Sequence, residues 1–490
     1  MEIRVRYAPS PTGLQHIGGI RTALFNYLFA RSRGGKMILR LEDTDRARYD
    51  ERFVANLYDA FSWLGIHWDE GPDRGGPFGP YVQSERFDIY KKYALELVNQ
   101  NRAYYCFCSS ERLEALRSGR EKSRSSESGY DRLCRGIRAE EAAGRAAKEP
   151  CTIRLKIPLG ESTRFHDSLL GDVEWKNDDV NPDPVLIKSD GFPTYHLANV
   201  VDDHLMEISH VLRAQEWLSS TPLHAILYAS FGWEAPLFCH LPMVMGQDGK
   251  KLSKRHGAAG IDEFRRRGYL SEALINYVAL LGASYKEGKD VYTIEELAEY
   301  FSLEKLNKAP AVFDYKKLQW YNEQYLRMKN DAELAGLCLE AAGTELFGEG
   351  GPSADEKAAF TAAMPLIRER ISFPAEAAEK LRYLFADPPL PEAAEFIPKK
   401  SDLKTAAELL RTGREITPAL AEAENDEKAE TLIKEEAEKR GVKPGDLMMP
   451  LRVALTGARV SPPLFGSIRI LGAEKAGSRI DRALELLERS

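Results

Sequence analysis

The stretch that decides the fold is Arg6-Tyr7-Ala8-Pro9-Ser10-Pro11-Thr12-Gly13-Leu14-Gln15-His16-Ile17-Gly18-Gly19. Apolar and basic residues alternate over residues 3–7, which predicts a strand, and apolar residues from Thr22 to Ala30 recur at helical spacing. A strand, a Pro/Gly loop and a helix N-terminus together direct unpaired N–H groups and a positive dipole end toward one point, which suits a phosphate. No Gly-x-x-x-x-Gly-Lys motif is present, so a purely structural turn is an equally open interpretation.

Composition indicates a globular protein of several domains. The 490 residues are 43% hydrophobic, which is enough for more than one core. No segment approaches the roughly 20 apolar residues of a membrane span, and the N-terminus lacks a signal-peptide pattern. Six cysteines make no disulfide framework, so we expect a cytoplasmic protein with no membrane partner. The net charge of −7 argues against a generic nucleic-acid coat protein, although 68 Lys and Arg can still gather on one face.

A second buried strand is predicted over Lys36–Glu42, and the acidic cluster of residues 42–45 ends it. In an open α/β sheet, polar residues just past the carboxyl end of a strand face the ligand crevice. We therefore expect Glu42 to point into a site, while Asp45 caps the next helix. Another helix is predicted from about Ser84 to Gln100.

The sheet is expected to resume in residues 192–204. A strand over Met206–Leu212 then ends at Arg213, and a helix follows over Glu216–Ser230. Three histidines in this region follow no usual metal-ligand spacing, so we favour structural roles for them. They are His196, His204 and His210.

A basic loop follows the short strand predicted over residues 242–245. Glycines bracket its cations, which are Lys250, Lys251, Lys254 and Arg255. A run of charges is usually a solvated face. At a strand end, in a glycine-hinged loop, it is also typical of a phosphate clamp. From Asp262 onward the sequence predicts mostly helices.

Cysteines raise the question of a metal. Cys106, Cys108 and Cys134 are candidate zinc ligands, but a zinc site requires four ligands. Cys151 is a remote fourth candidate, and Gly136 stands where a nearby ligand would help. Ordinary buried thiols are therefore the favoured interpretation, and no metal is assigned.

Three separated motifs together make the chain resemble the bacterial glutamyl-tRNA synthetases, which are class I aminoacyl-tRNA synthetases. They are Ala8-Pro9-Ser10-Pro11-Thr12-Gly13 with His16-Ile17-Gly18-Gly19, Tyr195-His196-Leu197-Ala198-Asn199-Val200-Val201-Asp202-Asp203, and Lys251-Leu252-Ser253-Lys254-Arg255. The similarity covers nearly the whole chain, through Leu451–Phe465. One departure from the class-wide His-Ile-Gly-His signature is Gly19 in place of the last histidine, a variant that glutamyl enzymes share.

The resemblance implies an α/β fold. It has a Rossmann-like, parallel-sheet catalytic domain, an inserted α+β acceptor-binding domain and a mostly α-helical C-terminal anticodon-binding region. The two halves of the catalytic domain would be residues 1–103 and 191–257, the latter with the Lys251–Arg255 loop, and the insertion would be 104–190. Residues 258–325 would form a helical stem-contact domain and residues 326–490 the anticodon-binding domain. We expect a monomer.

The implied reaction has two steps. The glutamate α-carboxylate attacks the α-phosphate of ATP, and a terminal hydroxyl of tRNA(Glu) then accepts the glutamyl group. Such phosphoryl transfer depends on positioning and on neutralised charge, with Mg²⁺ bound to the ATP. The residues that would bind ATP are His16, Gly18, Gly19, Lys251, Ser253 and Lys254, of which His16, Lys251 and Lys254 would be catalytic.

Selection of glutamate requires recognition of two carboxylates and one ammonium, and arginine suits a carboxylate. By resemblance, the glutamate-binding residues are Arg6, Ser10, Glu42, Tyr195, Asn199 and Arg213. Arg368 and Arg370 are candidates to contact the tRNA anticodon, although an exposed helix face is an equally open interpretation.

Several rival functions stay open at this point. The nearest are a glutaminyl enzyme and a non-discriminating enzyme that also charges tRNA(Gln) with glutamate. A simple nucleotidyltransferase would leave the long helical region after Lys254 without a role. A non-catalytic tRNA-binding paralogue is disfavoured because the lysines of the 251–255 loop are intact.

Overall fold

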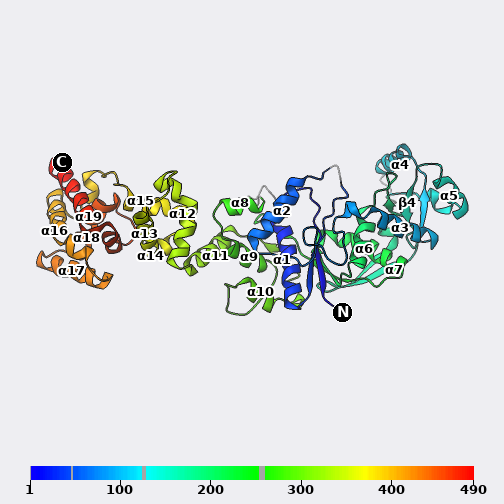
Figure 1. Ribbon diagram of the computed structural model, residues 1–490, viewed down its shortest axis with the longest axis horizontal. Helices are drawn as coiled ribbons and strands as arrows, with labels where there is room; N and C mark the ends of the chain where they lie inside the picture. Colours follow the sequence, from blue (N-terminus) through cyan, green and yellow to red (C-terminus); the bar gives the residue numbers. More distant parts are fainter. Residues whose placement is uncertain (1, 46–47, 124–128, 253–259) are drawn as a thin grey trace. The chain divides into compact units, whose positions relative to one another are not determined.

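The computed structural model describes residues 2–45, 48–123, 129–252 and 260–490. These form two compact units, one of residues 1–266 and 274–315 and the other of residues 267–273 and 316–490. The first unit, blue through green in Figure 1, is α/β, and the second is helical. Within the described ranges, no helix combines the length and apolar character that crossing a membrane requires.

The chain begins with a parallel βαβ unit. Strand β1 (Arg4–Tyr7) pairs with β2 (Lys36–Leu39), and α1 (Ile17–Ser32) connects them. The predicted strands and helix are thus confirmed, with different limits. Helix α1 begins earlier than its apolar pattern because His16 caps it, its Nδ1 accepting a hydrogen bond from the Gly19 N–H at 3.3 Å.

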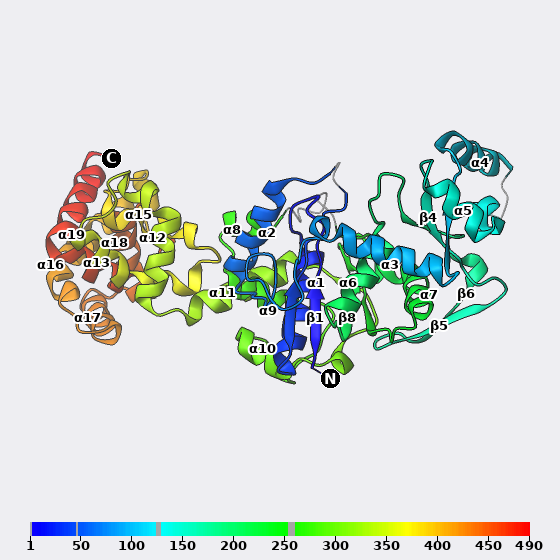
Figure 2. The ribbon, with the colours of Figure 1, turned by 45° about the vertical axis from the view of Figure 1, so that its right-hand side comes forward.

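A second group of strands lies beside β1. Strand β8 (His210–Ala214) pairs in parallel with β9 (Leu237–Leu241), and the Ser209 N–H just before β8 donates to the Arg4 carbonyl at 2.9 Å. Figure 2 shows β1 and β8 side by side. On its other edge β9 pairs with β5 (Ser162–Asp167), which continues into the antiparallel partner β6 (Gly171–Lys176).

Helices pack against these strands and build the core. They are α2 (Glu51–Leu64), α3 (Phe87–Asn99), α6 (Tyr195–Leu205) and α7 (Thr221–Phe231). The expectation that Asp45 caps α2 is wrong, because the Asp50 carboxylate does so, accepting from the Arg52 N–H at 2.9 Å.

The expectation that residues 192–204 resume the sheet is also wrong, because Tyr195–Leu205 is helix α6. Its fully buried apolar residues are Leu197, Ala198, Val200 and Val201. These positions recur at intervals of three and four, the helical period. The same period places Tyr195, Asn199 and Asp203 along another side of the helix, so these three side chains share one face.

The remaining elements of the first unit form smaller sheets and helices. Strands β3 (Ala103–Cys106), β4 (Thr152–Leu155) and β7 (Val185–Ile187) form an antiparallel sheet, and β10 (Val244–Met245) pairs in parallel with β11 (Ala311–Val312). The helices are α4 (Ser110–Ser123), α5 (Ala139–Ala146), α8 (Ile261–Arg266), α9 (Ser271–Ala279) and α10 (Ile294–Tyr300).

The second unit confirms the predicted helical C-terminal region. Its helices are α11 (Tyr315–Met328), α12 (Asp331–Phe347), α13 (Ala354–Ala362), α14 (Met364–Ile367), α15 (Ala377–Phe385), α16 (Leu403–Ala421), α17 (Asp426–Lys439), α18 (Pro444–Thr456) and α19 (Leu464–Arg489). Helix α17, charged along its sequence, still buries Ala429, Ile433 and Ala437 on one side. Helix α19 is interrupted by a kink at Gly472.

Candidate active site

A cavity of about 470 Å³ lies at the carboxyl ends of β1 and β8. It is lined by every predicted ATP- or glutamate-binding residue that the structure describes, namely Arg6, Ser10, His16, Gly18, Gly19, Glu42, Tyr195, Asn199, Arg213 and Lys251. Two further predicted residues, Ser253 and Lys254, lie outside the described residues. Residues far apart in sequence thus converge because parallel strands end at the same edge of a sheet.

One corner of the cavity is the start of α1. His16 Nδ1 accepts the Gly19 N–H, so in the neutral ring the proton is on Nε2 and can be donated to a ligand. Enclosure by the site, together with the charge of Lys251, lowers the pKa of His16 and favours the neutral form. Lys251 lines the same cavity and pairs with the Glu216 carboxylate.

The presence of glycine at position 19 has a steric explanation. A Cβ atom at this position would lie 2.8 Å from the Tyr7 hydroxyl oxygen, which is too close for a real contact. The Tyr7 hydroxyl is itself fixed because it donates to Gln15 Oε1 at 2.8 Å. Any side chain at position 19, including the histidine of the class-wide signature, would collide with it.

Beside this corner lies a buried cluster of charges. The Asp203 carboxylate accepts hydrogen bonds from Arg6 at 3.1 and 3.3 Å and from Arg40 Nη1 at 2.7 Å. Arg40 Nη2 also donates to Glu42 Oε1 at 3.0 Å, and Asn199 Nδ2 approaches the same oxygen at 3.4 Å. All five side chains are less than 10% exposed, so these ion pairs determine where Arg6 and Glu42 point.

The cluster continues away from the cavity. Asp202 accepts from Arg86 Nε at 2.7 Å, from the Tyr90 hydroxyl at 2.8 Å and from Gln83 Nε2 at 2.9 Å. Arg40 Nε lies 3.8 Å from the same carboxylate. Each buried carboxylate in the cluster therefore has at least one arginine partner, as burial of a charge requires.

Arg213 differs from Arg6, Arg40 and Arg86 because no carboxylate of the described residues pairs with it. Arg21, which also lines the cavity, donates to the Leu281 and Pro242 carbonyls. The Arg213 guanidinium donates to neutral acceptors: His240 Nε2 at 3.1 Å, His224 Nδ1 at 3.2 Å, the Tyr195 hydroxyl at 3.3 Å and Thr221 Oγ1 at 2.8 Å. Burial lowers the pKa of Arg213 from its ordinary value. Burial also lowers the pKa of His196, to about 4, and Arg213 adds to this effect.

The arginines and carboxylates of the cluster differ in how directly they pair. Arg6, Arg40 and Arg86 each contact a carboxylate of Glu42, Asp202 or Asp203. Arg213 contacts none of these three, and the Asp167 carboxylate reaches it only through His240. A carboxylate of a ligand could therefore pair with Arg213 directly.

Sequence reasoning did not identify the residues that hold this site together. Asp203 stood in a quoted motif, and its spacing of four from Asn199 would have revealed it had the segment been interpreted as a helix. Arg40 is a lone charge directly after the buried residues 37–39, which is itself a signal. Trp217, whose ring lies 4.6 Å from that of Tyr195, and the histidines at 224 and 240 carried no recognisable pattern.

The two arginines considered for tRNA binding have different surroundings. Arg368 donates to the Arg327 carbonyl at 2.9 Å, to the Lys329 carbonyl and to Asp331, so its guanidinium is engaged within the second unit. Arg370 is exposed, at the end of the same turn. Its charge contributes to lowering the pKa of Arg452, after the larger effect of burial.

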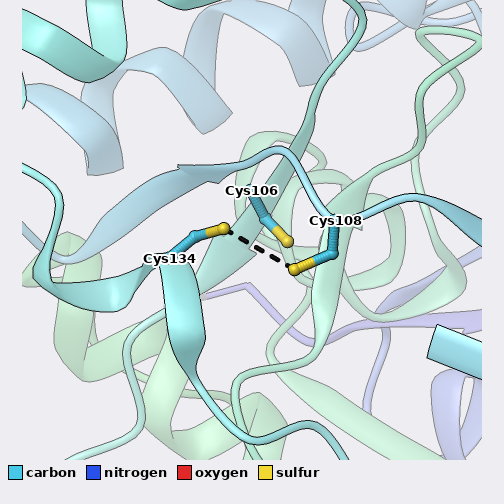
Figure 3. Close-up of side chains that lie close together, drawn as sticks. All are labelled: Cys106, Cys108 and Cys134. Atoms are coloured by element: carbon cyan, nitrogen blue, oxygen red, sulfur yellow. Dashed lines mark hydrogen bonds between the residues drawn. The ribbon is translucent and has the colours of Figure 1, made fainter. Parts of the chain in front are cut away.

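Three of the six cysteines, Cys106, Cys108 and Cys134, lie close together in the first unit (Figure 3). The sulfur atoms of Cys106, Cys108 and Cys134 all lie within 4.8 Å of one another, and those of Cys108 and Cys134 are 3.6 Å apart. The Tyr130 hydroxyl lies 3.3 Å from Cys106 Sγ and 3.5 Å from Cys108 Sγ. Cys151 is not part of the group. A fourth potential ligand, the Tyr130 oxygen, therefore lies beside the three sulfur atoms, and sequence reasoning missed it.

Comparisons with known proteins agree with this fold. The family model for "tRNA synthetases class I (E and Q), catalytic domain" matches residues 2–320, and that for "Anticodon binding domain" matches residues 330–484. The chain therefore belongs to the class I tRNA synthetases of the glutamate and glutamine type.

Individual relatives are similar over their full lengths. A glutamate–tRNA ligase of Treponema denticola is 54% identical, covering 99% of both chains, and one of Borreliella burgdorferi is 47% identical with the same coverage. A crystal structure of a glutamate tRNA ligase from Elizabethkingia meningosepticum in complex with its amino acid has a TM-score of 0.88 at 34% identity. It covers 99% of this chain and 100% of that one.

Removal of the Asp203 charge tests the buried cluster. We expect Asp203→Asn to lower the free energy of unfolding by about 3 kcal/mol or more, because Arg6 and Arg40 lose their shared carboxylate in the interior. Asp59→Asn, at the exposed ion pair with Arg265, is the control and should cost about 1 kcal/mol or less. Urea denaturation measures both. Equal losses would contradict the assigned importance of the buried pairs.

Proposed function

We propose that this chain ligates L-glutamate to tRNA(Glu) in two ATP-dependent steps, through glutamyl-adenylate. The observation that supports this most directly is the single cavity, which joins a phosphate-binding helix N-terminus to a buried arginine with no anionic partner. ATP and glutamate would meet at the point where these two parts touch. The glutamate–tRNA ligases with 47–54% identity support the same reaction.

In the first step an α-carboxylate oxygen of glutamate attacks the α-phosphorus of ATP. The bond from that phosphorus to the bridging oxygen breaks, and pyrophosphate leaves. ATP enters as its magnesium complex. Nε2–H of His16, the backbone at Gly18 and Gly19 and the ammonium of Lys251 would neutralise charge on the phosphates, joined by Ser253 and Lys254 from the same signature.

The second step transfers the glutamyl group. A terminal ribose hydroxyl of the tRNA attacks the carbonyl carbon of the adenylate, the bond from that carbon to the phosphate oxygen breaks, and AMP leaves. For this chain, residues 104–190 are proposed to hold the acceptor stem, residues 258–325 to contact the stem, and residues 326–490 to bind the anticodon.

Glutamate recognition follows from the charges of the cavity. Arg213 would bind the side-chain carboxylate, Glu42 the ammonium, and Arg6 with Ser10 the α-carboxylate, while Tyr195 and Asn199 form polar walls. The Arg213 guanidinium, which contacts no carboxylate of the described residues, favours the side-chain carboxylate of glutamate over the neutral amide of glutamine. A buried site that lacks its matching charge rejects the analogue strongly.

Aminoacylation of separated tRNAs tests the proposal. Purified protein should attach glutamate to tRNA(Glu) only when ATP and Mg²⁺ are present, and glutamine should not replace glutamate. The absence of charging on any glutamate-acceptor tRNA would refute the function. Glutamate attached to tRNA(Gln) as well would instead identify a non-discriminating enzyme. We further propose a cytoplasmic monomer, which sedimentation of the purified protein would test.

The signature lysine that follows Ser253 offers a matched test of the phosphate contacts. Lys254→Ala should slow adenylate formation at least about tenfold, equivalent to roughly 1.4 kcal/mol of transition-state stabilisation, because one charge contact is lost. Lys250→Ala is the control, since Lys250 is exposed and does not line the cavity. Single-turnover kinetics measure both. A Lys254→Ala rate equal to that of the parent would contradict the role.

Anticodon contact is proposed for Arg370 in particular, because the Arg368 guanidinium is engaged internally. We expect Arg370→Ala to raise the KM for tRNA about tenfold, the loss of one charge-assisted contact, with unchanged thermal stability. Arg368→Ala should instead lower the unfolding midpoint, because two backbone carbonyls lose their donor. Equal effects of the two substitutions on the KM for tRNA would contradict this division.

For the cysteine cluster we propose one structural zinc ion, bound by Cys106, Cys108 and Cys134, with the Tyr130 oxygen as fourth ligand. Three thiols and one oxygen match the donor number and chemistry that zinc prefers. Two cations lie near the cluster, since the Arg154 guanidinium lies 3.9 Å from the centre of the Tyr130 ring and Arg112 approaches Cys108 Sγ at 3.5 Å. Burial nevertheless raises the pKa of Cys108, to about 11, and the pKa of Tyr130, so deprotonation of these ligands would accompany metal binding.

Elemental analysis decides between this site and ordinary thiols. We expect one zinc per purified chain, and Cys134→Ser should remove it. Cys151→Ser, which changes a cysteine outside the cluster, should retain it. Metal-free protein with fully reactive thiols at 106, 108 and 134 would refute zinc binding. Chelation should lower the thermal stability of the first unit, because metal binding contributes to folding.

A further inference from the structure

The orientation of Arg213 depends on groups that do not themselves line the cavity. Its Nη1 donates to the Tyr195 hydroxyl, at the cavity, and to His224 Nδ1, while its Nε donates backward to His240 Nε2 at 3.1 Å. His240 is fully buried and is not among the cavity-lining residues. The backward contact leaves the guanidinium edge formed by Nη1 directed toward the cavity.

The hydrogen-bond directions determine the protonation of His240. Arg213 Nε–H is always a donor, so His240 Nε2 must be the acceptor and carry no proton. The ring proton is then on Nδ1, which lies 2.6 Å from Asp167 Oδ2 and donates to it. Asp167 thereby selects the one neutral tautomer of His240 that can accept from Arg213.

Asp167 is itself fully engaged. Its Oδ2 accepts from the backbone N–H of His240 at 3.0 Å as well as from the imidazole ring. Its Oδ1 accepts from the backbone N–H groups of Leu169 at 2.9 Å and Leu170 at 2.8 Å. Burial alone would raise the pKa of Asp167, but the hydrogen bonds from His240 and from the backbone hold it below its ordinary value. The carboxylate is therefore charged, and it fixes the ring from a rigid position.

Strand register brings the three residues together. Arg213 on β8 is directly opposite His240 on β9, and Asp167 at the end of β5 pairs with Phe238 of β9. Three adjacent strands thus each contribute one member of the chain Asp167–His240–Arg213. Asp167 belongs to the 104–190 segment, whereas Arg213 lines the cavity. This series of hydrogen bonds therefore connects two parts of the protein that are distant in sequence.

We propose that Asp167 and His240 are positioning residues for Arg213 and thereby set the affinity for the side-chain carboxylate of the substrate. This inference rests on the proposed role of Arg213 in glutamate binding. Neither residue touches the substrate. The negative charge of Asp167, relayed through a neutral imidazole, polarises the hydrogen bond to Arg213 without cancelling the charge that the substrate carboxylate must meet.

A matched pair of substitutions at position 240 tests the proposal. The side-chain oxygen of glutamine can occupy the place of Nε2 and accept from Arg213, whereas asparagine reaches only as far as Nδ1. Aminoacylation at saturating ATP and tRNA measures the KM for glutamate. We expect His240→Asn to raise it roughly tenfold or more, the loss of one hydrogen bond to a charged group, and His240→Gln to raise it much less.

Asp167→Asn provides a second variant. An amide nitrogen in place of Oδ2 would force the ring to accept at Nδ1 and to carry its proton on Nε2, facing the Arg213 donor. The KM for glutamate should rise as in His240→Asn. The KM for ATP and the unfolding midpoint serve as internal controls, because a general loss of structure would change these values together with the KM for glutamate.

The outcomes separate this inference from the function on which it rests. A selective increase in the KM for glutamate in His240→Asn and Asp167→Asn, with recovery in His240→Gln, supports it. Equal effects of Asn and Gln at position 240, or an unchanged KM, would overturn it. Arg213→Ala is run in parallel. If that variant leaves the KM for glutamate unchanged, the proposed role of Arg213 fails and the positioning inference fails with it.

Discussion

The site depends most on the ion pairs that the Asp203 carboxylate forms in the interior. This carboxylate accepts from Arg6 and Arg40 together, and Arg40 in turn holds Glu42. One buried anion on helix α6 therefore sets the directions of a cation on β1 and of an anion just past β2. Because buried charges are costly unless paired, these groups stay in one arrangement, which pre-organises the cavity before any ligand enters.

Arg213, in contrast, has no carboxylate partner among the described residues. Its buried guanidinium contacts only neutral acceptors, so pairing with an anionic ligand would be favourable. Arg6 is nearly neutralised by Asp203, whereas Arg213 is not. Neither residue type nor spacing reveals this difference between two arginines of one cavity.

The predicted and observed structures differ in an informative way at residues 195–205. Alternating apolar pairs in this segment fit a short strand as well as a helix, so the period was ambiguous over eleven residues. Tyr195 and Asn199 were predicted to line the site by resemblance, which does not depend on the type of element. A strand would place Asp203 about 13 Å beyond Asn199, whereas one helical turn brings the two side chains next to each other. The limits of α1 and α2 depended similarly on caps, His16 and Asp50, that a side-chain pattern does not specify.

The sequence by itself determined the class of fold and the order of its α/β and helical parts, and its resemblance to a known family indicated ten of the residues that line the cavity. Hydrophobic period and short motifs are local properties, so they can be recognised without coordinates. Only the tertiary structure decided which charges are paired, that Tyr130 joins the three cysteines, and that Asp167 reaches Arg213 through His240. These relations join residues as far apart as Arg6 and Asp203, which are 197 positions apart, and strand register and burial, which establish them, exist only in the folded chain.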